Sequence, residues 1–131
     1  MFTQQLTTHA ANLAADAMLA SLGGTMLRIY DGEQPKDADD LITDQVLLVE
    51  CAFGFAAFAP AEGGVAAAYQ IQPGAAINSG KARWFRTDAF DGSVGPWRDG
   101  KKQSANLELT EVHIAAGRMV EITNLVYQQK R

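Results

Sequence analysis

Hydrophobic residues recur along the N-terminal part of the chain with helical spacing. In residues 5–22 one stripe repeats every three or four positions and consists of Leu6, Ala10, Leu13, Ala17 and Ala20. This spacing predicts one amphipathic helix, and Gly23-Gly24 directly afterwards predicts its end. The stripe is rich in alanine, which permits close approach either to a sheet or to a neighbouring subunit, and of the two we expect packing on the protein's own sheet.

From residue 25 onward the hydrophobic pattern has a period of two, which is typical of β-strands. Strands are expected in residues 25–31, 45–53, 65–71, 81–86, 107–109, 112–114 and 119–127. In the second of these, Leu47, Val49, Cys51 and Phe53 share one face, so Cys51 is expected to point into the core. Seven or eight short strands at close spacing predict a mainly β fold, a β-sandwich or jelly-roll-like domain with one N-terminal α-helix.

Residues 81–100 form the most strongly patterned stretch of the chain. Trp84 and Arg86 alternate with Phe85, and the pair Asp91-Gly92 follows. An Asp-Gly pair accepts the positive φ of a tight hairpin turn, so the pattern predicts a β-hairpin that turns at Asp91 and is anchored by a buried Trp84.

Two loops stand out by composition. Residues 32–44 are acidic and contain Pro35, which favours an exposed loop. Their carboxylates, Asp37, Asp39, Asp40 and Asp44, raise the alternative of a calcium site, but the loop lacks the glycine and glutamate positions of the helix-loop-helix calcium motif. Residues 54–64 form an apolar loop whose aromatics are either an exposed contact patch or a cap on the core.

The overall composition sets the class of protein. The chain has 131 residues, which predicts one domain, with residues 1–24 as the helical segment and 25–131 as the β-sandwich. Its formal net charge of -4 disfavours nucleic acid and anionic membranes as partners. A single cysteine excludes an intrachain disulfide and a cysteine-based zinc site. No signal peptide or transmembrane window is evident, and we expect folding in a reducing cytoplasm.

The residues that could support catalysis form no recognisable set. His9 and His113 are the only histidines, and neither has a nucleophile or metal ligand at a useful spacing. Glu108 and Glu111 are interpreted as ordinary strand-surface residues, and the paired glycines lack a phosphate-binding motif. We therefore expect no enzyme activity, no cofactor and no metal.

Several short motifs resemble a group of small structural proteins of tailed bacteriophages and prophages. The first is LRIYDG at residues 27–32, followed by Gln34-Pro35 and the acidic loop. The others are ARWF at residues 82–85 with DGSV at 91–94, and Leu-Glu-Leu at 107–109 before a final strand pair. Together with the alanine-rich helix, this likeness extends over nearly the whole chain. The charged Lys101-Lys102 and the tail at residues 128–131 depart from the family pattern.

The resemblance implies a virion protein that is assembled in the bacterial host cytoplasm. Its first implication is a capsid decoration, or cement, protein that binds the major capsid protein or neighbouring virion proteins, as a homo-oligomer. A neck or tail component, such as a head-tail connector, is the alternative, and a carbohydrate-binding β-sandwich that uses Trp97 with Asp99 is a third reading. The candidate partner contacts are Phe2, Phe55, Phe58 and Trp97.

Overall fold

A computed structural model describes residues 4–98 and 102–129. The fold is mainly β, with a β-sandwich-like arrangement and a single N-terminal helix, which confirms the predicted fold class. The elements are α1 (Thr8–Ala20), β1 (Met26–Asp31), β2 (Val46–Ala52), β3 (Val65–Ala67), β4 (Gly74–Ala75), β5 (Gly80–Lys81), β6 (Trp84–Arg86), β7 (Asp91–Pro96), β8 (Leu107–Leu109), β9 (His113–Ile114), β10 (Met119–Val120) and β11 (Ile122–Gln128).

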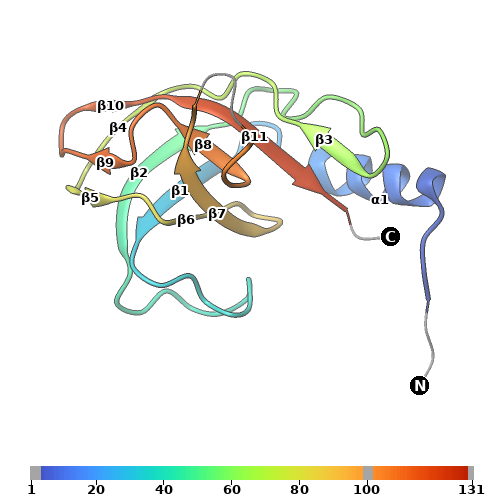
Figure 1. The fold of residues 1–131 in the computed structure, drawn as a ribbon, viewed down its shortest axis with the longest axis horizontal. Helices are drawn as coiled ribbons and strands as arrows, with labels where there is room; N and C mark the ends of the chain where they lie inside the picture. The colour runs from blue at the N-terminus through green and yellow to red at the C-terminus, as the bar shows by residue number, and fades with distance from the viewer. Residues whose placement is uncertain (1–3, 99–101, 130–131) are drawn as a thin grey trace.

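Seven strands form the main sheet, in the order β2-β1-β6-β7-β8-β11-β3. All neighbours in it are antiparallel except β7 and β8, which are parallel. Two small pairs, β10-β4 and β5-β9, lie beside it (Figure 1). Most of the predicted strands are confirmed, but the described residues contain eleven strands rather than seven or eight, because several predicted strands are broken by turns.

Hydrogen bonds from residues 72–77 close the sheet into a curled, barrel-like layer. The N–H groups of Gln72 and Ile77 donate to the carbonyls of Ala52 and Leu48 on β2, at 3.0 and 2.8 Å. Between them, β4 pairs with β10, which leads directly into β11 of the main sheet. The outer edge of β2 is therefore joined back to the far side of the sheet.

The core lies inside this layer and beneath α1. Its largest fully buried members include Phe85, Leu27, Ile29, Leu48, Leu107, Leu109 and Leu125, with Leu19 and Leu22 from the helical segment. Cys51 is buried among them, as predicted, and burial raises the pKa of its thiol to about 11. The thiol is a packing group in the native state.

The helix presents a different face to the core from the one predicted. Ala11, Ala15 and Leu19 are buried, whereas the predicted stripe faces outward and its central Leu13 is 57% exposed. Two tertiary hydrogen bonds set this rotation: the side chains of Asn12 and Asp16 accept the N–H groups of Gly64 and Ala61, at 2.7 and 2.8 Å. The prediction that the stripe packs on the sheet is therefore wrong.

The predicted hairpin forms, but its turn lies elsewhere. Strands β6 and β7 pair antiparallel, and Asp91-Gly92 begins β7 instead of turning the chain. The turn is at residues 87–90, where the hydroxyl of Thr87 accepts the N–H groups of Ala89 and Phe90 at 3.1 and 3.0 Å. A threonine side chain that holds its own turn competes successfully with the Asp-Gly signal.

Two further sequence interpretations are corrected. The strand predicted to reach residue 71 ends at Ala67 as β3. Glu108 is not a surface residue: it is 4% exposed, and its carboxylate accepts hydrogen bonds from Ser104 and Asn124. Those bonds satisfy the buried carboxyl oxygens and hold the segment before β8 in place.

Candidate functional site

One candidate site is an apolar loop, residues 54–60, beside the end of α1. The loop is fixed at both ends by backbone hydrogen bonds. Gly24 donates to the carbonyl of Gly54 at 3.0 Å, and Tyr69 donates to the carbonyl of Ala57 at 3.0 Å. A side chain at position 23 would overlap the carbonyl of Phe55, so Gly23 allows the loop to lie directly against the helix end.

The two aromatics of this loop have different environments. Phe55 is 99% exposed, so its ring is fully in solvent. Phe58 is half-buried against the core, and its ring lies 5.9 Å from that of Phe53. Phe58 therefore anchors the loop while Phe55 is displayed by it.

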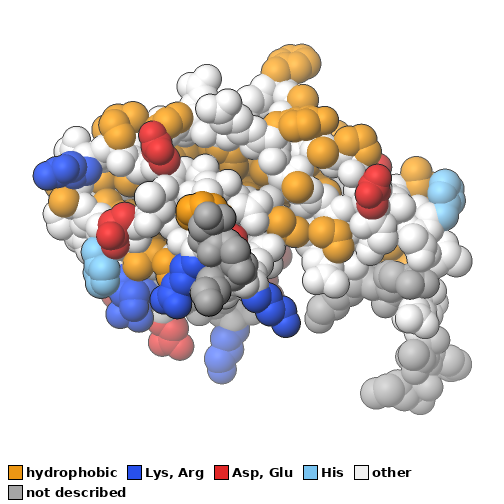
Figure 2. All heavy atoms as spheres, turned by 45° about the horizontal axis from the view of Figure 1, so that its top comes forward, with side chains coloured by type: hydrophobic (Ala, Val, Ile, Leu, Met, Phe, Trp, Pro, Cys, Tyr) orange, Lys and Arg blue, Asp and Glu red, His pale blue; other side chains and the backbone are white. Residues whose placement is uncertain are grey.

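A shallow groove of about 410 Å³ runs beside the displayed ring. Its walls come from the end of α1, the apolar loop and Tyr69, which is 51% exposed. Asp16 is the charged residue in the lining, and its Oδ1 is engaged by the N–H of Ala61. Figure 2 shows hydrophobic side chains spread over this face of the molecule, many of them in its upper and right-hand parts. A rigid loop that displays an aromatic ring beside an apolar groove is suited to bind another macromolecule's apolar surface.

The other candidate contacts are not brought into this groove. Trp97 is 42% exposed, and its backbone N–H donates to Leu109 at 2.9 Å, which places it at the end of β7. It is absent from the groove lining. Phe2, and Asp99 of the carbohydrate-binding alternative, lie outside the described residues.

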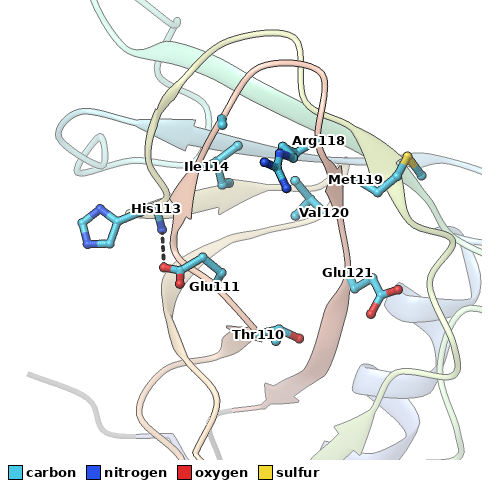
Figure 3. A pocket seen from close by; sticks show the side chains of 9 residues that line it. Thr110, Glu111, His113, Ile114, Arg118, Met119, Val120 and Glu121 are labelled. Carbon is cyan, nitrogen blue, oxygen red and sulfur yellow. Dashed lines mark hydrogen bonds between the residues drawn. The ribbon is translucent and has the colours of Figure 1, made fainter.

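A second hollow, of about 390 Å³, opens between β9 and β10 (Figure 3). These two strands pair with different partners, β5 and β4, so their facing edges diverge around it. Glu111, Arg118 and Glu121 line it with charge. The imidazole of His113 points away in Figure 3, while its backbone N–H donates to Glu111 at 3.0 Å.

The two histidines are not brought together in the described part of the chain. Figure 2 shows the two pale-blue histidines at opposite ends of the molecule, in keeping with the positions of α1 and β9 in Figure 1. Among the described residues, no three His, Cys, Asp or Glu side chains gather in a way that could hold a metal ion. In the acidic loop, carboxylates of Asp37 and Asp40 instead accept backbone N–H groups of the loop itself.

An ordered polar and aromatic cluster lies on the face of the sheet opposite the core. The ring of Trp84 is fully buried and stacks on Tyr30, with centroids 4.5 Å apart. The guanidinium of Arg86 lies 5.3 Å from the centroid of Trp84 and binds both carboxylate oxygens of Asp91, at 2.7 and 2.8 Å. It also donates to the carbonyl of Asp40 at 2.7 Å, so one arginine fastens the acidic loop to the sheet.

Asp31 closes the other end of that loop. Burial alone would raise the pKa of Asp31, but hydrogen bonds from the N–H groups of Lys81 and Gly32 and from Arg83 outweigh it and lower the pKa below its ordinary value. The carboxylate at Asp31 is therefore favoured in the folded state.

The stabilising effect of the Asp31 carboxylate is expected to depend on pH. Because the pKa of Asp31 is lowered by folding, its contribution is present above the unfolded-state pKa and is lost as pH falls below about 4. Asp31→Asn should cost at most about 1 kcal/mol at pH 7, since the Arg83 pair is open to solvent, and the deficit should shrink at pH 3. Urea unfolding at both pH values measures this.

The matched control is Asp88→Asn, a change at an exposed side chain of the turn before β7. If the deficit of Asp31→Asn is the same at pH 3 and pH 7, then the carboxylate's charge is not what stabilises the fold there.

The comparisons with known proteins return no match: no family model, no curated protein and no solved structure is similar to this chain. The described helix falls short of the length and hydrophobicity that a membrane span requires.

Proposed function

We propose that this chain is a structural protein of a tailed-phage virion, and specifically a decoration protein that binds the assembled head. The observation that carries the proposal is the fixed apolar loop with Phe55 99% exposed at its surface. The short motifs around LRIYDG and the WFR strand, which resemble small virion proteins, supply the class of partner. In this proposal the chain binds without catalysis, cofactor or metal.

The binding mechanism is adhesive. Phe55 inserts into an apolar depression of the major capsid protein or a neighbouring virion protein, and the groove receives a side chain in return. Burial of one phenylalanine contributes about 1.5–3 kcal/mol, which is modest for one copy. Icosahedral symmetry repeats the contact, and copies that span subunit boundaries would strengthen the shell through avidity.

The hydrogen bonds that hold the loop keep the entropy cost of binding small. Because Gly54 and Ala57 are already held by Gly24 and Tyr69, little loop entropy is lost on binding. Phe58, packed on Phe53, keeps the base of the loop in place while the tip makes the contact.

Cosedimentation with assembled capsids tests the proposal, with free capsid protein and isolated tails as comparison samples. We expect saturable binding to shells alone, at a fixed ratio to capsid subunits. Phe55→Ser should weaken it by about tenfold or more, because the buried aromatic area is lost. Its stability should be unchanged, since Phe55 makes almost no contact in the monomer.

The matched control is Ile77→Ser, which removes another exposed hydrophobic side chain, 58% exposed, that does not line the groove. Equal binding of the two variants would remove Phe55 from the interface. If the unmodified protein does not bind to shells, the decoration role is wrong. Binding to tails instead would support a neck or tail component.

A further inference from the structure

Within the described residues, the outer face of α1 is an apolar helix surface that no other element covers. Leu13 lies at its centre and is 57% exposed, with the exposed Ala17 and Ala20 along the same stripe. The opposite face already packs on the core through Ala11 and Ala15. Figure 1 places the helix at one end of the molecule, where a second macromolecule can reach it.

Two polar residues flank this face on one side only. His9 and Asp16 are exposed and lie seven residues apart, which is close to two helical turns, so they share a flank. Within the described residues, no hydrogen bond or ion pair is made by the imidazole of His9. Asp16 uses Oδ1 to accept the N–H of Ala61 and keeps its carboxylate at the surface.

This arrangement is complementary to itself. In an antiparallel helix pair related by a two-fold axis, the same flank of each helix meets, and sequence order is reversed across the axis. An axis that passes between Asn12 and Leu13 brings His9 of each helix opposite Asp16 of the other. The same axis brings the two Leu13 side chains together, and the small side chains of Ala17 and Ala20 allow the helices to approach closely.

We propose that a second copy of this chain docks on α1, forming a two-fold antiparallel helix pair with Leu13 at its centre and reciprocal His9–Asp16 contacts. Histidine donates an N–H to a carboxylate in either protonation state, so the polar contacts fix the register while leucine supplies the burial. The inference does not require the virion role, although Asp16 and Ala20 also line the groove beside Phe55, so the dimer would cover part of that groove. In a virion such a pair would carry two Phe55 loops and bind bivalently.

Analytical ultracentrifugation of the unmodified chain, without any capsid, is the test. We expect a monomer–dimer equilibrium between about 1 and 200 μM, the range in which modest interfaces are populated. Leu13→Asp should weaken dimerisation by about a hundredfold or more, because both copies lose a buried leucine and gain facing carboxylates. Ile77→Asp, at an exposed position beyond β4, should leave it unchanged.

His9 provides a pair of variants whose effects on folding and association have opposite signs. In the first turn of the helix, His9→Asp favours the isolated helix and His9→Lys disfavours it, because of the helix dipole. Across the proposed interface, His9→Lys should tighten the dimer through Asp16, and His9→Asp should loosen it. Urea unfolding of dilute monomer and sedimentation of concentrated samples measure the two effects separately.

A monomer at the highest concentration would overturn the proposal, as would equal dimerisation of Leu13→Asp and Ile77→Asp. A dimer that responds to Leu13→Asp, but in which His9→Lys and His9→Asp behave alike, would overturn the antiparallel register. None of these results depends on whether capsids are bound.

Discussion

Replacing Trp84 with alanine is expected to lower the free energy of unfolding by about 3–5 kcal/mol, the range found when large buried aromatics are truncated. Trp84 is fully buried, stacks on Tyr30 and lies under the Arg86 guanidinium, so its removal opens the centre of the outer cluster. Chemical denaturation followed by circular dichroism gives this number. Trp97→Ala, at a 42% exposed position, should cost less than about 1 kcal/mol.

Replacing Trp84 with phenylalanine distinguishes the stabilising effect of the buried ring from the cost of its buried indole N–H. The Nε1 atom of Trp84 is buried and has no hydrogen-bond partner among the described residues. An unpaired buried donor costs about 1–3 kcal/mol, so Trp84→Phe removes that cost while it loses part of the ring. We expect the two terms to offset to within about 1 kcal/mol. If phenylalanine were as damaging as alanine, the indole N–H would have a stabilising partner.

Gly74→Ala is expected to cost about 3 kcal/mol by forcing apart the seam that closes the sheet. A Cβ at position 74 would overlap the carbonyl oxygen of Glu50 and lie 3.0 Å from the side chain of Val49. Relief requires β4 to move away from β2. Amide hydrogen exchange should show this as faster exchange at Gln72 and Ile77, the two donors to β2.

Gly54→Ala is the matched control. The nearest atoms to a Cβ there are 3.8 Å away, an ordinary contact, so stability should change little. If both glycine variants lose the same stability, the loss comes from the added methyl group in general rather than from the seam.

The strands with the clearest alternation were predictable from the sequence, and the reason is physical. In β2 the alternation of buried Val49 and Cys51 with the half-buried Glu50 follows the period of two that a sheet with one buried face imposes. The predicted place of Leu47 on that buried face is wrong: Leu48 is buried instead, because the pairing of β2 with β1 is irregular at this point. The turn at Thr87 was not predictable in the same way. Two turn signals lie four residues apart, and the register with β1, in which Trp84 faces Tyr30, decides between them.

The helix shows where the pattern becomes ambiguous. Alanine occurs on both faces of α1, so hydrophobic spacing alone does not distinguish a stripe through Ala11 and Ala15 from one through Leu13 and Ala17. The hydrogen bonds of Asn12 and Asp16 to distant backbone groups decide it, and long-range pairs of this kind leave no local signal.

The sequence predicts the apolar loop of the candidate site but not which of its aromatic side chains is exposed. Residues 54–60 are recognisably an apolar loop, but the exposure of Phe55 depends on the contact of its backbone with Gly23, thirty-two positions earlier in the sequence. The half-buried position of Phe58 similarly depends on its bridge to Ala68. Spacing identifies such residues as candidates, and the tertiary packing assigns their roles.

The closure of the sheet also determines how the protein behaves when it is concentrated. An unpaired sheet edge is a template on which identical chains add strands and aggregate. Here β2 is bonded to residues 72–77, and β3 at the other end of the sheet is covered by the bridge between Phe58 and Ala68. Many copies can therefore stand close together on one surface and meet through side chains, without merging into a continuous sheet.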